Sequence, residues 1–399
     1  MENVAAAPEL PPKKRTTLIE QEPYGGFEQG PIRPPSEAGS LLLRVTRNCP
    51  WNRCKFCSTY KDTRFSRRPL DHVIRDIEAV YLAAQTFCGK GGEADRLVLA
   101  RLKAGGEAPG DLQAWQAAAH WLRHGQQSVF LQDADSLAIG PSDLAAILSH
   151  LRKRFPGVRR VTSYARSSTV ARLNLRDLQA IREAGLNRLH IGLESGANEV
   201  LRLVHKGTTR NQQILAGRQV KQAGLELSEY YMPGLGGRRL WRAHAQATAA
   251  AFNEINPDFI RLRTLAILYG TPLHQDYQSG RFKRLTDLEM AREVQLFLES
   301  LRGITSVVQS DHFRNLLPEV AGALPQDQGR MLAVVENFLS LNQDEQMIYQ
   351  VGRRTGIFHG LEDLQDPCRR RRAEETIWKN RITPENVDDL MTELMRRFD

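Results

Sequence analysis

Six short apolar segments, each followed by a stretch with helical periodicity, constrain the fold of this 399-residue chain more than any other feature. Glycines stand just past several of the expected helices, at positions where helices commonly end. Strands that alternate with helices favour a parallel sheet with right-handed crossover connections. An open doubly wound sheet and a barrel both satisfy this pattern. The expected strands are Leu41–Val45, Ser128–Gln132, Arg159–Tyr164, Arg188–Leu193, Glu226–Tyr231 and Phe259–Leu262.

The pattern divides the chain into three parts. Residues 1–38 are rich in proline and lack apolar periodicity, which predicts an extended or disordered segment. Residues 39–270 carry the alternation of strands and helices, and the sites of parallel barrels lie where such strands end. Residues 271–399 are expected to form a mainly helical extension. Helices are expected at 70–86, 93–124, 142–154, 174–184, 198–204, 210–223, 241–253, 286–302, 328–341, 343–354 and 384–398, and a short apolar run at 306–308.

The composition narrows the class of protein. The net charge is +9, which suits anionic partners such as nucleic acid, nucleotides or phosphorylated metabolites without choosing among them. No uninterrupted apolar run approaches the roughly 20 residues of a membrane helix, and the N-terminus lacks the apolar core of a secretory signal. Five cysteines, three of them clustered, do not form a disulfide pattern. We expect a soluble, cytoplasmic protein without membrane association.

Cys49, Cys54 and Cys57 lie within nine residues, directly after the first expected strand. Thiolates are ligands of both zinc and iron–sulfur clusters. A structural zinc site would need a fourth ligand, and the next candidates, His72 and Cys88, are distant in sequence. An iron–sulfur cluster held by three cysteines instead leaves one iron open for chemistry. The pattern favours such a cluster, and a zinc- or cluster-bearing nucleic-acid-binding protein without catalytic activity is the alternative.

This cysteine loop, with Phe56 between the last two cysteines, resembles the cluster loop of radical S-adenosylmethionine (SAM) enzymes. That superfamily usually places three residues and then two between its cysteines, whereas this chain places four and then two. The resemblance implies that Cys49, Cys54 and Cys57 ligate a four-iron, four-sulfur (4Fe-4S) cluster, whose open iron binds SAM. It also implies a partial barrel of six strand–helix units, of the TIM-like radical SAM type, over residues 40–270.

Residues 191–207 closely resemble the segment shared by oxygen-independent coproporphyrinogen dehydrogenases, methylthiotransferases and related radical SAM enzymes. Glu194 follows the fourth expected strand between Gly192 and Gly196, where the lack of side chains lets a ligand approach the backbone. Considered alone, Glu194 would equally suit the N-terminus of the next helix. The resemblance implies that Glu194 and the basic Lys206 help to hold SAM.

Two further strand ends carry candidate SAM contacts. Gly234 and Gly236 follow the fifth expected strand and resemble the glycine-rich segment that contacts the SAM adenine, although a plain tight turn is the alternative. Arg166 follows the third strand, and its guanidinium could bind the SAM carboxylate through two parallel hydrogen bonds. An ordinary surface arginine is the competing interpretation.

The second expected strand ends on Asp133 and Asp135. The superfamily often has a Gly-Gly-Glu stretch at this position that binds the SAM amino group, and this chain has none. We expect Asp133 or Asp135 to bind the SAM ribose or the substrate, and a solvated turn is the alternative. Asp311 and His312, which follow the expected barrel, could provide an acid–base pair for the substrate, and a structural role is the simpler interpretation.

The resemblance also implies the chemistry. A reduced electron donor, such as flavodoxin or ferredoxin, would drive cleavage of SAM to methionine and a 5′-deoxyadenosyl radical. That radical would abstract a hydrogen atom from an unidentified small-molecule or RNA substrate. The sequence identifies no catalytic residue for the substrate. Only Cys88 and Cys368 remain for an auxiliary cluster, and no cobalamin-binding or acetyltransferase domain is expected, so we expect a single-cluster enzyme.

Overall fold

The computed structural model describes residues 22–88 and 109–396. Its centre is an eight-stranded sheet in the order β1-β4-β5-β6-β7-β8-β9-β10, in which only the last pair is antiparallel. A small second sheet pairs two short strands beside it. The bounds are β1 (Leu41–Arg44), β2 (Thr46–Arg47), β3 (Ser66–Arg67), β4 (Ser128–Gln132), β5 (Arg160–Ala165), β6 (Arg188–Glu194), β7 (Glu226–Tyr231), β8 (Phe259–Leu262), β9 (Val307–Gln309) and β10 (Gly322–Ala323).

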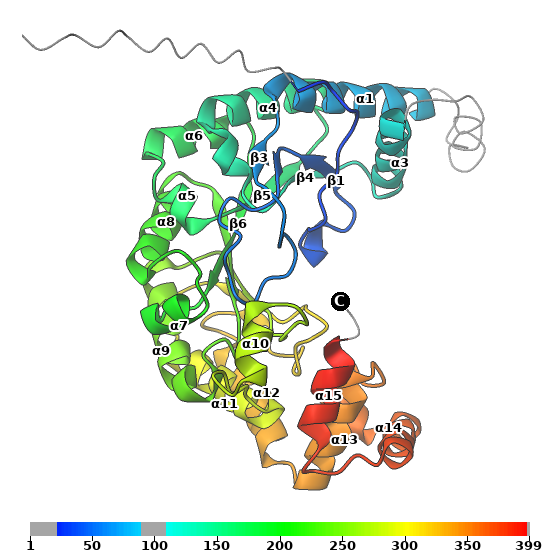
Figure 1. Cartoon of the computed structure of the whole chain (residues 1–399), viewed down its shortest axis with the longest axis vertical. Helices are drawn as coiled ribbons and strands as arrows, with labels where there is room; N and C mark the ends of the chain where they lie inside the picture. The colour runs from blue at the N-terminus through cyan, green and yellow to red at the C-terminus, as the bar shows by residue number, and fades with distance from the viewer. Residues whose placement is uncertain (1–21, 89–108, 397–399) are drawn as a thin grey trace, which may run out of the picture.

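The parallel sheet expected from the sequence is confirmed, and it has the form of a partial barrel. The sheet is curved, and its helices line the outer, convex side, as Figure 1 shows. β1 and β10 form the two edges in the described part of the chain, so the barrel stays open between them. The helices up to β8 are α1 (Leu70–Cys88), α3 (Pro109–Arg123), α4 (Pro141–Arg154), α5 (Ser167–Val170), α6 (Leu175–Glu183), α7 (Asn198–Leu203), α8 (Arg210–Gln222) and α9 (Gly237–Ile255).

Several boundaries differ from the expectations. α9 begins at Gly237 rather than near Trp241, and the short helices α5 and α10 (Pro272–Gln278) were not predicted. The apolar run near residue 307 is β9, which pairs in parallel with β8, so the sheet continues beyond the six expected strands. Of the helix expected at 93–124, residues 93–108 lie outside the described residues.

The two faces of the sheet differ in character because alternate residues of a strand point to opposite sides. Fully buried aliphatic residues, among them Leu43, Val129 and Val161, belong to the main hydrophobic core between sheet and helices. The inner face carries aromatic and polar side chains. Phe130, Tyr164, His190 and Tyr230 form a row of ring contacts across β4 to β7, with centroid separations of 5.0 Å for Phe130–Tyr164 and 6.0 Å for Tyr164–His190. The interior is therefore suited to a polar ligand.

The described part of the N-terminal segment packs on the start of the sheet. The Gln132 side chain accepts a hydrogen bond from the Gly30 N–H at 2.8 Å and donates to the carbonyls of Gly30 and Ile32 at 3.0 and 2.7 Å. Further along, the fully buried Glu37 pairs with Arg160 at 3.2 Å. These contacts fix the path of the chain before it enters β1.

The segment after β8 is mainly helical. α11 (Asp287–Ser300) packs against α9 and α12, and Figure 1 shows α13, α14 and α15 grouped beyond the end of the sheet. The remaining bounds are α12 (Gln328–Ser340), α13 (Gln343–Arg354), α14 (Pro367–Asn380) and α15 (Val387–Arg396). Within the described ranges, no helix combines the length and the apolar character needed to cross a membrane.

Candidate functional site

Three half-buried thiols lie on the loop between β2 and β3, which we call the cluster loop (residues 48–60). Asn48 and Asn52 turn the loop with φ values of 68° and 47°, and asparagine tolerates this left-handed conformation better than most residues. The Asn52 N–H lies 3.5 Å from the Cys49 sulfur, and the Cys57 N–H donates to the Cys54 carbonyl at 3.4 Å. The loop backbone thus places an N–H group beside the Cys49 thiol.

The donor set of the cluster loop fits an iron–sulfur cluster better than a closed zinc site. In the described part of the chain, no group of three or more His, Cys, Asp and Glu side chains converges on a single metal ion. A 4Fe-4S cluster does not require such convergence, because each thiolate binds a different iron. Burial raises the pKa of the Cys54 thiol and the other two thiols raise it further, whereas Lys206 and Arg166 lower it. The positive charges of Lys206 and Arg166 would therefore partly offset the negative charge of the thiolates.

The cluster loop docks onto the segment that follows β6. The Trp51 indole N–H donates to the His205 carbonyl at 2.7 Å, and the Lys55 N–H donates to the Val204 carbonyl at 2.9 Å. Two motifs that are about 150 residues apart in sequence are thereby held together.

Helix α10 supports the same loop from the other side. The Lys55 ammonium pairs with Asp276 at 2.8 Å, and the Lys55 carbonyl accepts from the Leu273 N–H at 3.0 Å. Asp276 also pairs with Arg281 at 2.8 Å, and its pKa is lowered chiefly by the hydrogen bond from Lys55. No sequence pattern predicted this helix, and its contacts with the cluster loop are visible only in the fold.

Gly207 is expected to tolerate no side chain. Its φ is +71°, and an added Cβ would lie 2.3 Å from the Trp51 ring. We expect Gly207→Ala to destabilise the protein by about 1–2 kcal/mol or more, because the backbone is strained and Trp51 must leave the docked position. Urea unfolding measures this loss. Gly157→Ala is the matched control, since Gly157 has open space around it; equal stability of the two variants would contradict the docking role.

Glu194 and Lys206 form an ion pair at the end of β6. The β6–β7 pairing is irregular here, Glu194 has a φ of 63°, and its carboxylate lies over Gly192 of the same strand. Its Oε1 lies 3.3 Å from the Lys206 ammonium, and a Cβ at Gly192 would lie 2.4 Å from that oxygen. Burial opposes the charge of Lys206, but Glu194 and Cys54 hold its pKa above the ordinary value. Gly192 is therefore needed for space.

The second oxygen of Glu194 provides a test of ligand fit. Oε2 is buried and has no hydrogen-bond partner among the described residues. A buried acceptor without a hydrogen-bond donor lowers the stability of the fold, so such atoms are commonly satisfied by a bound ligand or water. A carboxylate oxygen accepts hydrogen bonds from hydroxyl groups, which is the chemistry of a ribose.

Arg166 and Asp135 lie beside this pair. The Arg166 guanidinium donates to the Lys206 carbonyl at 3.2 Å and lies over the Trp51 ring, 5.4 Å from its centroid. Asp135 accepts from the Arg166 N–H at 3.3 Å and from the Thr169 hydroxyl at 2.5 Å. Burial raises the pKa of Asp135 to about 6. The structure thus brings Arg166, Lys206 and Glu194 together, and Asp135 holds the backbone of Arg166.

Asp133 lies at the base of the cluster loop and is fully buried. One oxygen pairs with Arg44 at 2.7 Å and accepts from the Asn48 N–H at 3.1 Å. The other oxygen accepts from the Tyr60 hydroxyl. Both oxygens are thus engaged within the protein, by residues at the two ends of the loop.

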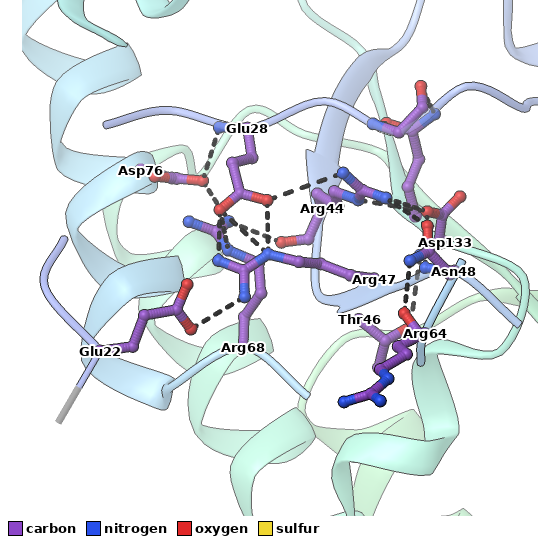
Figure 2. A network of polar contacts seen from close by, with 12 residues as sticks. Glu22, Glu28, Arg44, Thr46, Arg47, Asn48, Arg64, Arg68, Asp76 and Asp133 are labelled. Carbon is purple, nitrogen blue, oxygen red and sulfur yellow. Dashed lines mark hydrogen bonds and ion pairs between the residues drawn. The ribbon is translucent and has the colours of Figure 1, made fainter. Parts of the chain in front are cut away.

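A second ionic network ties the described N-terminal segment to the same strands. Figure 2 shows Glu28 between Arg44, Arg47 and Arg68, and the closest pair, Glu28–Arg47, is 2.6 Å apart. Arg68 also pairs with Asp76 at 2.5 Å, and both side chains are fully buried. These contacts anchor β2 and β3, from which the cluster loop emerges.

Gly234 and Gly236 lie where β7 leads into α9. Gly234 has a φ of +89°, and its N–H donates to Glu293 of α11 at 3.1 Å. A Cβ at Gly236 would lie 3.0 Å from the Leu240 backbone, so the close start of α9 explains that glycine. The end of β7 is therefore held by a residue more than 50 positions later.

A buried network that the sequence analysis missed joins the ends of β6 and β7. His244 of α9 lies 2.8 Å from the Ser195 hydroxyl and 3.0 Å from the Met232 carbonyl, to which its Nε2–H donates in the neutral tautomer. Glu293 accepts from the Tyr231 hydroxyl at 2.8 Å. Burial lowers the pKa of His244 to about 4 and raises that of Glu293 to about 8. The only sequence signal was that these polar residues stand at core-facing helix positions.

The raised pKa of Glu293 predicts a dependence of stability on pH. Burial destabilises the ionised carboxyl, which has a pKa of about 8 in the folded protein and an ordinary value of 4.5. The raised pKa contributes to the free energy of unfolding because the folded protein keeps the proton that the unfolded chain loses. This contribution is fully present below pH 4.5 and is lost as the pH rises towards 8, at up to about 1.4 kcal/mol per pH unit. Unfolding of wild type and Glu293→Gln at pH 5.5, 7.0 and 8.5 measures it. We expect the glutamine variant to gain relative stability with pH; parallel curves would contradict this.

Two adjoining hollows lie between the ends of β7 and β8 and the C-terminal helices. Both are lined by Thr264, Asp287 and Met290. The larger one also reaches Gly234 and Met391 of α15. The helical segment therefore forms one wall of the space next to the glycine-rich strand end.

Comparison with known proteins identifies the family. The family model described as the radical SAM superfamily matches residues 43–242, which is half of the chain. Two tRNA uridine(34) acetyltransferases are similar over 132 residues, with 28% identity for that of Methanocaldococcus infernus and 26% for that of Methanocaldococcus jannaschii. Each match covers 32% of this chain. This chain spans about a quarter of the length of these relatives, 24% and 23%.

A third relative, 4′-phospho-dehydrooxetanocin synthase of Priestia megaterium, is 28% identical over 196 residues, or 47% of this chain and 22% of that protein. Among solved structures, coproporphyrinogen III oxidase from Escherichia coli aligns with a TM-score of 0.41 and 14% identity, over 62% of this chain and 48% of that one. Methylornithine synthase aligns with a TM-score of 0.41 and 15% identity, over 69% and 68%. On the strength of the family match, the chain belongs to the radical SAM superfamily of enzymes, which use SAM and a 4Fe-4S cluster.

Proposed function

We propose that Cys49, Cys54 and Cys57 ligate the 4Fe-4S cluster and that Glu194, Lys206 and Arg166 hold SAM beside it. The observation that carries this proposal is the docking of the cluster loop onto the segment after β6, through Trp51 and Lys55. It brings the three thiols to the same strand ends as the candidate SAM contacts.

Each candidate contact has a chemical task. The Glu194 Oε2 atom, buried without a partner, would accept hydrogen bonds from the ribose hydroxyls. Arg166 would donate to the SAM carboxylate through its guanidinium. Lys206 would hold the Glu194 carboxylate in place for SAM and would stabilise negative charge at the cluster. Gly234 and Gly236 would let the adenine approach the backbone.

The two aspartates are better suited to positioning than to direct contact. Asp133 holds both ends of the cluster loop through Asn48 and Tyr60, and Asp135 holds the backbone of Arg166. Their oxygens are already engaged, so a ligand would have to displace internal hydrogen bonds to reach them. We therefore propose that both act on SAM through the residues they hold.

When bound, the cluster and SAM supply reductive cleavage to methionine and a 5′-deoxyadenosyl radical that abstracts a hydrogen atom from the substrate. Radical SAM enzymes need a reductant, and we propose flavodoxin or ferredoxin for this chain. The protein's own task is to position SAM, exclude water and select the hydrogen atom.

The substrate is proposed to be an RNA or a small metabolite. One set of relatives is named for a tRNA and another for a phosphorylated product, and the net charge of +9 suits either. Binding of an RNA that weakens steeply with salt would favour the first, because phosphate contacts release counterions.

Anaerobic reconstitution with iron and sulfide, followed by dithionite and SAM, tests the proposed function. We expect a coloured protein that produces 5′-deoxyadenosine, quantified by chromatography. A colourless protein that binds about one zinc and yields no nucleoside would contradict the proposal and favour a binding protein with a closed tetrahedral site.

A further inference from the structure

Two arginines project from the same face of β8 and its continuation. Arg261 is neutralised by Asp311, whose Oδ2 lies 2.6 Å from its Nη1, and it also donates to the Ser228 hydroxyl at 3.2 Å. Arg263 stands two residues further on and faces the same interior side, because strand residues alternate. Its N–H donates to the Tyr231 carbonyl at 2.9 Å, which continues the strand pairing. The Arg263 side chain is exposed, and no carboxylate pairs with it in the described part of the chain.

The segment after β9 adds nitrogen-bearing side chains around Arg263. Asn315 clamps this segment to the end of β8, since it accepts from the Thr264 N–H at 3.0 Å and donates to the Leu262 carbonyl at 2.8 Å. His312 belongs to this segment, and Arg263 acts on it electrostatically. Burial, Arg263 and Arg314 together lower the pKa of His312 to about 3, so the imidazole is neutral at physiological pH. Its Nδ1 accepts from the Arg314 N–H at 3.3 Å, which leaves the proton on Nε2.

Two tyrosine hydroxyl groups also belong to the surroundings of Arg263. Tyr164 and Tyr230 lie on the inner face with ring centroids 6.4 Å apart, and burial raises the pKa of both phenols. Arg263 is close enough to act electrostatically on each of them. Protonated phenols can donate hydrogen bonds, so these two hydroxyl groups can act as donors towards an anion.

The place of Arg263 separates it from the candidate SAM contacts. Arg166 follows β5 and Glu194 ends β6, whereas Arg263 follows β8, three strands away from β5. Neighbouring strands are about 4.8 Å apart, so about 14 Å of sheet lies between the two arginines. That span leaves room for a substrate to face SAM with one end and Arg263 with the other.

We propose that Arg263 binds an anionic group of the substrate, a phosphate or a carboxylate, with His312 and the tyrosine hydroxyls as further donors. The inference rests on the proposed function, because it places the substrate opposite SAM. An arginine offers a planar fork that matches either anion, and it stands where no internal carboxylate neutralises it. The earlier interpretation of Asp311 and His312 as an acid–base pair is less suitable, since Asp311 is held by Arg261.

Calorimetric titration of the reconstituted holoenzyme tests this inference, with inorganic pyrophosphate and malonate as the two probes, in the presence and absence of SAM. We expect saturable binding to wild type and at least about 10-fold weaker binding to Arg263→Gln. Arg263→Lys should be intermediate, because it keeps the charge and loses the fork. Arg242→Gln is the control, since Arg242 is an exposed arginine over the Trp241 ring on α9.

The stronger of the two probes identifies the anion as phosphate or carboxylate. Absence of saturable binding to wild type, or equal binding by Arg263→Gln and wild type, would overturn the inference. The readout does not require turnover. A protein that binds the anion and forms no 5′-deoxyadenosine contradicts the proposed function alone, whereas one that cleaves SAM and binds neither anion contradicts this inference alone.

Discussion

Replacing Cys54 with alanine is expected to abolish cluster binding and, with it, the reductive cleavage of SAM. Loss of one thiolate leaves two protein ligands for a cluster that needs three. Changes to residues that merely support a ligand already cost about 10–100-fold, so loss of a ligand should reduce 5′-deoxyadenosine formation by at least roughly 100-fold. Iron and sulfide content after anaerobic reconstitution measures the first loss, and chromatography of the nucleoside measures the second.

Cys368→Ala is the matched control for this experiment. Cys368 is an exposed thiol on α14, away from the cluster loop, and its removal should leave iron content and nucleoside formation unchanged. If Cys54→Ala retained both the cluster and the cleavage activity, the assignment of the cluster loop would be wrong. If both cysteine variants lost iron equally, the loss would reflect general damage and not ligation.

Asp133→Ala is expected to lower the free energy of unfolding by about 3 kcal/mol. The substitution leaves Arg44 without the carboxylate at 2.7 Å and leaves the Asn48 N–H and the Tyr60 hydroxyl without their acceptor. Removing one partner of a buried pair typically costs about 3–5 kcal/mol. We place the loss at the lower end because Glu28 remains 3.7 Å from Arg44. Urea unfolding of the cluster-free protein gives the value.

The same variant separates two roles for Asp133. A positioning role predicts lower stability together with poorer cluster retention, because both ends of the cluster loop are released. A direct contact with SAM predicts weaker SAM binding at unchanged stability, which would contradict the role that the contacts indicate. Asp71→Ala is the control, since Asp71 is exposed on α1 and its pairing with Arg75 is long, at 3.6 Å. A change within about 0.5 kcal/mol is expected there.

The parallel sheet followed from short-range patterns, whereas its strand order is given by the structure. Short apolar runs, helices closed by glycine, and right-handed crossovers together leave few arrangements for residues 39–270. The choice between an open sheet and a barrel did not follow, because it depends on whether helices cover one face or both. Only the packed structure shows the helices on the convex side and the aromatic row from Phe130 to Tyr230 on the other.

The candidate site was predictable where its residues are neighbours in sequence. The three cysteines and the segment 191–207 stood out because each is a compact motif with its own chemistry. The contacts of Asp133 could not be predicted, because Arg44 and Tyr60 lie more than 70 positions earlier in the chain. The hydrogen bond from the Gly234 N–H to Glu293 could not be predicted either. Helical periodicity indicates which residues are buried, but it does not indicate which residues they contact.

The sequence by itself therefore determined the family and the alternation of strands and helices, and it indicated the candidate cluster loop, because these depend on local spacing. The tertiary structure alone decided which polar residues support the site, which stay unpaired and which face the opening. Asp133 turned out to be engaged within the protein, whereas Arg263 stands exposed without a carboxylate among the described residues. The physical reason is that the burial and the ion pairing of a side chain depend on residues from distant parts of the chain. Local sequence patterns do not predict these long-range contacts.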